Sequence, residues 1–254
     1  MLAEREDRIS ALAGHLVQGD PAQIAFQTSE IAGDLVYLRH GIEVRPGDLV
    51  IDAGGNLGAT AAFFATQCGA RVHSFEPVPA TFAQLEANLA DIEGCTSHPF
   101  GLAREAGTRR MFTYGGGDSV LSGIDAEPER IRELLAIAGR NLGLSEERAQ
   151  EMAAERCVPR EVECRFETLS GFISVRGIER VDLLKIDVEG AEADLLRGIA
   201  APDWGRIAQI AAEIHSDELL AEVSAILAEN SFRVFTEQSP ELAGTPVRFL
   251  YARR

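Results

Sequence analysis

The sequence predicts an α/β domain built on a mostly parallel sheet with helices on both of its faces. Short apolar runs alternate with helix-period segments from about residue 48 onward, as in a doubly wound sheet. The final two expected strands follow each other without a helix between them, which predicts that they pair antiparallel. The chain has 254 residues, enough for one large domain around a sizeable core.

We divide the chain into an N-terminal helical lead-in, 1–47, and a main domain, 48–254. Apolar residues at helical spacing, from Ile9 to Leu16, predict an amphipathic helix over 4–18. Residues 21–47 are expected to be irregular with short elements, ending in the turn Arg45-Pro46-Gly47-Asp48. In the main domain we expect strands at 48–53, 71–76, 95–100, 181–187, 207–214, 231–236 and 246–252, and helices at 57–67, 79–90, 190–198 and 216–229.

The segment from about 115 to 160 interrupts this alternation and is predicted to be a helical insertion. Gly115-Gly116-Gly117 indicates a flexible loop, and Asp118-Ser119 could close over a bound ligand. Two helices are expected, at 127–140 and 145–155, with Ser145 as N-cap of the second. Short β-like runs flank them at 110–114 and 161–166. We expect a lid or acceptor-binding element, with a dimerisation or packing element as the alternative.

Composition excludes several classes of function. The net charge of −16 argues against binding to nucleic acid, which needs clustered Lys and Arg. No apolar run reaches the roughly 18 residues of a membrane span, and the charged N-terminus lacks a signal core, so we expect a cytoplasmic protein without membrane contact. The four cysteines form no C-x-x-C pair, which disfavours a disulfide framework or a zinc site.

The stretch Asp52-Ala53-Gly54-Gly55-Asn56-Leu57-Gly58 is the most informative in the chain. It joins an apolar strand to a small-residue helix, and its glycines permit positive φ and close approach to a ligand. No Lys or Arg occurs from 46 to 70, so the loop suits a cation better than a pyrophosphate. Glu76 ends the next expected strand, where an acidic side chain typically accepts ribose hydroxyls.

A cofactor with a cationic end and a ribose fits both features, and S-adenosylmethionine has a sulfonium, an amino-acid end and an adenosine. Asp52 could serve the ammonium group, through water, and Glu76 the ribose. The nicotinamide fingerprint fits less well, because its glycine positions fall on Ala53, Gly55 and Gly58. We expect the cofactor site to comprise Asp52, Gly54, Gly55, Asn56, Gly58, Glu76, Pro77, Gly101 and Leu102.

Three segments together resemble the FkbM family of S-adenosylmethionine-dependent methyltransferases. They are 50–58, the run Phe75-Glu76-Pro77, and the most family-specific piece, Leu184-Lys185-Ile186-Asp187-Val188-Glu189-Gly190-Ala191-Glu192. The resemblance runs from about Tyr37 to the C-terminus, and the ending is similar to members from polyketide and nonribosomal-peptide pathways. It implies a class I methyltransferase fold, Rossmann-like, with seven strands of which the last is antiparallel, and mostly O-methylation.

For methyl transfer to a hydroxyl, a general base is worth about 10²–10⁴-fold. His215 is our leading candidate, because it follows a strand and lies on the same face as Glu213 by the two-residue period. An exposed or capping histidine is the alternative. Asp187 ends the 181–187 strand and could contact the acceptor, the methyl region or a metal. For Glu189 and Glu192 we favour a role in stabilising the start of the next helix.

We therefore expect an O-methyltransferase that acts on a hydroxyl of a small secondary metabolite (polyketide, peptide or sugar), possibly carrier-bound, and releases S-adenosylhomocysteine. A divalent metal could be held by carboxylates at 187, 189 and 213 but is not expected to be required. A homodimer is compatible with the sequence. The alternatives are a nicotinamide-dependent oxidoreductase and a catalytically silent protein that uses this fold for binding.

Overall fold

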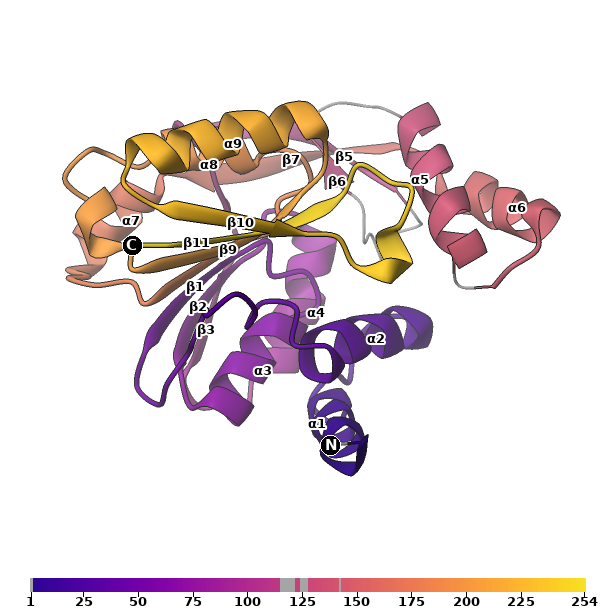
Figure 1. Ribbon diagram of the computed structural model, residues 1–254, viewed down its shortest axis with the longest axis horizontal. Coiled ribbons are helices and arrows are strands. Elements are labelled where there is room, and N and C mark those ends of the chain that lie inside the picture. Colours follow the sequence, from indigo (N-terminus) through magenta and orange to yellow (C-terminus); the bar gives the residue numbers. More distant parts are fainter. Residues whose placement is uncertain (1, 115–121, 124–127, 142) are drawn as a thin grey trace.

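The computed structural model describes residues 2–114, 122–123, 128–141 and 143–254. Its centre is a seven-stranded sheet in the order β10-β11-β9-β8-β1-β2-β3 (Figure 1). The strands are β1 (Leu49–Ala53), β2 (Arg71–Phe75), β3 (Cys95–His98), β8 (Leu183–Ile186), β9 (Gln209–Ile214), β10 (Arg233–Glu237) and β11 (Arg248–Arg253). β11 pairs antiparallel with both of its neighbours, and β3, β2, β1, β8 and β9 pair parallel. The predicted fold class and the antiparallel last strand are confirmed.

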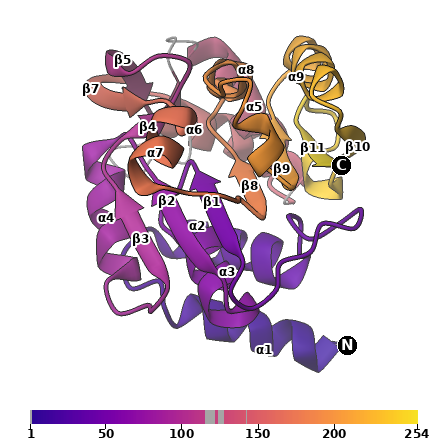
Figure 2. The same ribbon diagram turned by 90° about the vertical axis from the view of Figure 1, so that its left-hand side faces the viewer.

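Helices cover both faces of this sheet (Figures 1 and 2). One face packs on α7 (Leu169–Arg176), α8 (Glu192–Arg197) and α9 (Asp217–Glu229), the other on α3 (Ala59–Cys68) and α4 (Pro79–Leu89). The two-residue period of β1 explains the division, because Leu49 and Ile51 lie in the first core and Val50 in the second. With both faces covered, every residue of β1 is buried. Helix α7 was not predicted, since the run from Leu169 to Arg176 has little amphipathic pattern.

The order of strands reverses between β1 and β8. From β1 the chain adds β2 and β3 on one side, and β8 and β9 lie on the other. Such a switch point leaves a crevice at the carboxyl ends of the two central strands, where open α/β sheets bind ligands. The loops after β1, β2, β8 and β9 all end at this crevice, and they contain the glycine-rich loop, Glu76, Asp187 and His215.

A second, four-stranded sheet lies beside the main one, in the order β4-β7-β5-β6. Its strands are β4 (Gly101–Leu102), β5 (Gly107–Thr113), β6 (Ser122–Gly123) and β7 (Arg160–Glu167). The expected β-like runs at 110–114 and 161–166 thus pair with each other, antiparallel, as β5 and β7. Between β6 and β7 come α5 (Pro128–Asn141) and α6 (Glu146–Arg156), which pack together away from α3 (Figure 1). Ser145 caps α6 as predicted, accepting from Arg148 N. Gly115 to Ser119 lie outside the described residues.

The N-terminal segment is more helical than expected. After α1 (Leu2–Ala13), residues 21–33 form α2 (Pro21–Thr28) and a π-helical turn, η1 (Ser29–Gly33), where we predicted mostly irregular chain. Asp20 caps α2, accepting from Ala22 N and Gln23 N, and Pro21 starts it with a suitable φ. These start signals were present in the sequence. No helix in the described part of the chain is both long and apolar enough to cross a bilayer.

Candidate functional site

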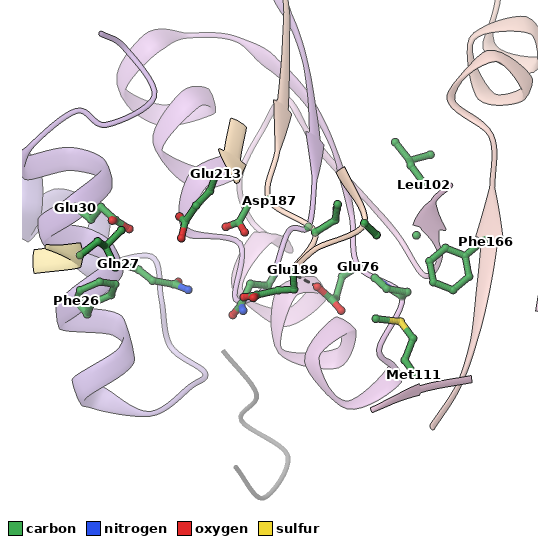
Figure 3. A pocket seen from close by; sticks show the side chains of 17 residues that line it. Phe26, Gln27, Glu30, Glu76, Leu102, Met111, Phe166, Asp187, Glu189 and Glu213 are labelled. Atoms are coloured by element: carbon green, nitrogen blue, oxygen red, sulfur yellow. Dashed lines mark hydrogen bonds between the residues drawn. The ribbon is translucent and has the colours of Figure 1, made fainter. Parts of the chain in front are cut away.

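A pocket opens at the carboxyl ends of the central strands (Figure 3). On one side lie Leu102, Met111 and Phe166, and on the opposite side Phe26, Gln27 and Glu30 from α2 and η1; carboxylates occupy the space between them. Of the expected cofactor residues, the lining contains Gly54, Asn56, Glu76, Pro77, Gly101 and Leu102. The other three expected residues, Asp52, Gly55 and Gly58, belong to the same loop but do not line the pocket.

The glycines of the loop are required by contacts within the protein. Gly54 has a φ of +82°, and a Cβ there would lie 1.7 Å from the backbone oxygen of Asp187. A Cβ on Gly55 would lie 2.2 Å from Ser74 Oγ and 2.3 Å from Leu85 Cδ1. We expected these glycines to allow close approach to a ligand; the structure shows that they let the loop after β1 lie directly against the chain after β8, against β2 and against α4. This contact brings the ends of β1 and β8 together at the crevice.

Asp52 lies behind the pocket in a buried ion pair. Its Oδ1 is 3.0 Å from Lys185 Nζ, and its Oδ2 accepts a 2.7 Å hydrogen bond from Ser74 Oγ. The side chain of Asp52 is 0% exposed and that of Lys185 is 2% exposed. Lys185 also donates to Gly54 O at 2.7 Å. The expectation that Asp52 offers its charge to a cofactor ammonium is therefore corrected: Lys185, which is distant in sequence, neutralises Asp52 and fixes the loop.

Glu76 lines the pocket at its centre (Figure 3). Its two carboxyl oxygens accept hydrogen bonds from Asn56 N at 3.1 Å and from Val78 N at 2.9 Å. Burial raises the pKa of Glu76 to about 7, although these two backbone donors favour its ionised form. The carboxylate is thus held rigidly at the end of β2, where a ribose acceptor was predicted.

One end of the pocket is mostly apolar. Leu102 comes from β4, Met111 from β5 and Phe166 from β7, so the second sheet supplies a flat, hydrophobic wall. Gly101 lets the Phe166 ring approach, since a Cβ on Gly101 would lie 2.5 Å from Phe166 Cε1. Such a wall suits a planar aromatic ring.

The other end of the pocket is strongly acidic. Of the described residues that line it, five carry carboxylates and none is Lys or Arg: Glu30, Glu76, Asp187, Glu189 and Glu213. This set favours a cationic ligand, as predicted from the loop, although the charge comes from η1, the loops after β2 and β8, and the end of β9 rather than from Asp52.

His215 lies directly behind these carboxylates. It is 6% exposed, and its Nε2 is 3.4 Å from Glu189, 3.7 Å from Glu213 and 3.9 Å from Asp187. Its Nδ1 is 3.0 Å from Glu192 Oε1. The structure therefore brings together all three predicted catalytic residues, and it adds Glu189 and Glu192.

The carboxylates change the acid–base behaviour expected of His215. Burial opposes the charged ring, but Glu189, Glu192 and Glu213 together raise the pKa of His215 well above its usual value. Burial likewise raises the pKa of Glu189 and of Glu213 well above their usual values. The expectation of an ordinary histidine titrating near neutrality is corrected, because the surrounding carboxyl groups hold the pKa of His215 well above its usual value.

Asp187, Glu189 and His215 each offer one ligand atom, and these atoms all lie within 4.8 Å of one another. Oxygen and imidazole ligands at such spacing are compatible with a single divalent cation. The carboxyl groups around His215 raise the pKa of its imidazole, so this ring offsets part of their negative charge without a metal.

A second cavity of about 730 Å³ lies next to the pocket and shares Phe26 and Glu30 with it. Its walls come from α2 and η1 on one side and from the chain after β10 on the other. Arg39 and Glu237 both line this cavity, and Arg39 Nη1 lies 2.5 Å from Glu237 Oε1. In the described part of α5 and α6, no residue lines either space.

Sequence reasoning missed the walls of both spaces. Phe26, Gln27 and Glu30 were left in the lead-in, and Met111 and Phe166 in the flanks of the insertion. Only the helix-start signal at Asp20 hinted that the first segment is ordered. Nothing local in the sequence could place it across the crevice.

Comparison with known proteins supports the resemblance. The family model described as "Methyltransferase FkbM domain" matches residues 52–234. A 31-O-demethyl-FK506 methyltransferase FkbM from Streptomyces tacrolimicus is 39% identical over 96% of this chain and 94% of its own. The AMB antimetabolite synthetase AmbE of Pseudomonas aeruginosa is 34% identical over 95% of this chain, which matches only 12% of that longer protein. Among solved structures, fibrillarin from Aeropyrum pernix matches 88% of this chain and 74% of its own, with a TM-score of 0.47 and 15% identity.

Proposed function

The chain belongs to the FkbM family of S-adenosylmethionine-dependent methyltransferases, and we propose that it methylates a hydroxyl of a small secondary metabolite. The observation that carries this proposal is the pocket itself, with an apolar wall at one end, Glu76 at its centre and a group of carboxylates at the other end. Family membership argues against a nicotinamide-dependent oxidoreductase, and the labelling screen described below distinguishes an active enzyme from a catalytically silent protein.

The residues of the pocket fit the cofactor in chemical character. The wall of Leu102, Met111 and Phe166 would hold the adenine, and Glu76 would accept the ribose hydroxyls. Asp187 and Glu213 would face the sulfonium and ammonium charges. When bound, the cofactor supplies an electrophilic methyl group on a positively charged sulfur.

The acidic end of the pocket can also remove the proton from the hydroxyl group of the acceptor. A hydroxyl that gains a methyl group must lose its proton, and Glu213 and Asp187 line the pocket where His215 does not. We place the proton acceptor on the Glu213 carboxylate, whose raised pKa makes it a stronger base than an ordinary glutamate. His215 then stabilises the cluster as a fixed positive charge 3.7 Å from Glu213.

The second cavity is the proposed site for the body of the acceptor. It meets the acidic end at Phe26 and Glu30, and its 730 Å³ is within the range of sites for drug-sized ligands. The lining suits a partly apolar, hydroxylated molecule, because it combines apolar, hydroxyl and charged side chains: Ala22, Ala25, Phe26, Val36 and Pro240, then Ser29 and Ser239, then Glu30, Asp34, Arg39 and Glu237. The relative that acts on 31-O-demethyl-FK506 supports this class, and the match within a synthetase supports a carrier-bound acceptor.

The test is a mass-spectrometric screen with trideuteromethyl-labelled cofactor. Hydroxylated candidates, 31-O-demethyl-FK506 among them, should gain one labelled methyl group on oxygen, with release of S-adenosylhomocysteine. At saturating cofactor, Glu213→Gln should transfer the methyl group at least tenfold more slowly than the wild type. Methylation of nitrogen or carbon would overturn the proposed reaction.

With an acceptor in hand, Ala25→Trp tests the cavity, because the indole would fill space beside the wall residue Ala25. The KM for the acceptor should rise at least tenfold, while the affinity for the cofactor stays unchanged. Val175→Trp is the matched control, since Val175 is 84% exposed and lies on α7. An unchanged KM in Ala25→Trp would place the acceptor elsewhere.

A further inference from the structure

Glu192 is a fully buried carboxylate next to the site. It is 0% exposed, in the first turn of α8, and its Oε1 contacts both Gly190 N and His215 Nδ1 at 3.0 Å. Its Oε2 is buried without a hydrogen-bond partner among the described residues. A buried carboxylate is costly unless a charged partner compensates it, and His215 is the cationic group in contact with it.

The contact with Glu192 determines which way the imidazole faces. With Nδ1 occupied by Glu192, the ring presents Nε2 to the carboxylates of Glu189, Glu213 and Asp187. A carboxylate behind one ring nitrogen is the usual means of fixing the orientation and the protonation of the other. Glu192 itself is separated from the pocket by the ring.

We propose that Glu192 is a positioning residue that fixes the orientation of the His215 ring, with Nδ1 toward α8 and Nε2 toward the pocket carboxylates. This inference rests on the proposed function, because it explains how His215 is held in place beside Glu213, the proposed proton acceptor. It also revises the expected role of Glu192, for which the sequence alone favours stabilisation of the start of the helix. The last six residues of the 184–192 motif thus connect a pocket carboxylate, Asp187, to the group that orients the histidine.

A purely local role does not explain the geometry as well. Helix α8 is only six residues long, and its N-cap, Ala191, makes no side-chain cap. Glu192 does accept from Gly190 N, but that bond uses the same oxygen that meets His215. A residue needed only for the turn would have no reason to be buried against His215, which directly follows β9.

Other charged groups lie close to the carboxylates around His215 and also affect the pH dependence of this cluster. Lys185 is 3.8 Å from Asp187, and Glu30 approaches Glu213 from η1. Both remain in place in a variant that changes Glu192 alone. A difference between that variant and the wild type therefore reports the Glu192–His215 contact.

The test is Glu192→Gln, which keeps the shape and the acceptor oxygen but removes the charge. Nitrogen-15 NMR of the histidine rings, without cofactor or acceptor, reads the protonation of each ring nitrogen, and His215→Asn assigns the signal. We expect both nitrogens of His215 to be protonated at pH 7 in the wild type. In Glu192→Gln the ring should lose its proton at least one pH unit lower.

Asp194→Asn is the matched control, on the same helix but a third exposed and paired with Arg109. It should leave the His215 signals unchanged. Glu192→Asp retains the charge and should retain the protonated ring, which guards against misfolding of the Gln variant. Identical His215 titrations in the wild type and in a folded Glu192→Gln protein would overturn the proposal.

Turnover gives a second readout. Glu192→Gln should lower kcat at least tenfold and shift its pH profile, with cofactor affinity within twofold of the wild type. An unchanged profile alongside normal turnover would also contradict the positioning role. Cofactor binding is measured separately. If the proposed function is wrong, the wild type itself will not bind the cofactor; if only the positioning role is wrong, both proteins will bind it and Glu192→Gln will turn over normally.

Discussion

Removal of Lys185 should destabilise the protein severely, because it leaves the charge of Asp52 buried without its ion-pair partner. Asp52 is 0% exposed, and only the Ser74 hydroxyl would remain as a hydrogen-bond donor. Breaking a buried ion pair from one side costs roughly 3–5 kcal/mol. Lys185→Met should therefore lower the free energy of unfolding by that amount, a large share of the roughly 5–15 kcal/mol of a typical domain.

Urea unfolding followed by tryptophan fluorescence measures this effect, since Trp204 is the single tryptophan and is buried. With an m-value of ~3 kcal/mol/M, the midpoint should fall by roughly 1–2 M. The double variant Asp52→Asn, Lys185→Met removes both charges and should recover most of the loss.

Arg45→Met removes an exposed pair with Glu43 and serves as the control with little effect. A loss below about 1 kcal/mol in Lys185→Met, with no recovery in the double variant, would refute the buried-pair reasoning.

Three further predictions concern the pocket. Glu76 has a pKa of about 7, so it gains charge as pH rises from 6 to 8; cofactor affinity should rise over that window, and Glu76→Gln should flatten the dependence in calorimetry. The effect on stability has the opposite sign. The folded protein holds this proton more tightly than the unfolded chain does, so raising the pH from about 4.5 to 7 lowers the free energy of unfolding. Gly54→Ala should cost at least ~3 kcal/mol in thermal unfolding, since its Cβ meets backbone; a neutral effect would contradict the close β1–β8 approach. His215→Ala should reduce kcat while cofactor affinity stays within a few-fold, and full activity would reject any catalytic part for His215.

The alternation of strands and helices was readable because periodicity is a local property. β1, β2, β8 and β9 fall where the apolar runs predicted them. No helix was predicted in the link before β11, which contains only the three-residue 3-10 turn η3 (Pro240–Leu242), and this indicated the antiparallel pairing of β11. The failures were also local. Residues 21–33 lack a long amphipathic pattern and were predicted to be irregular, although Asp20 and Pro21 mark a helix start.

The candidate site was predicted in outline because strand ends meet at the switch point. Glu76, Asp187 and Glu213 could be placed there from topology alone. The partner of Asp52 could not, since Lys185 reaches it only through the pairing of β1 with β8. The lack of Lys or Arg near Asp52 in the sequence therefore wrongly suggested that its negative charge is unpaired.

The same limit applies to His215 and to the walls of the pocket. A two-residue period placed His215 beside Glu213, but the shift in its pKa depends on Glu189 and Glu192 from another element. Phe166 and Phe26 reach the pocket from the second sheet and the N-terminal helices. Only packing between distant segments creates these contacts.

The central claim is that the acidic pocket at the switch point binds S-adenosylmethionine through Glu76 and its neighbours. Titration calorimetry of the wild type and of Glu76→Ala tests it most directly. We predict one cofactor per chain, and a loss in Glu76→Ala of about 1.5–3 kcal/mol, the value of a hydrogen bond to a charged group, or roughly 10–150-fold in Kd. Absence of detectable binding to the wild type at millimolar cofactor, or equal affinity in the two proteins, would contradict it.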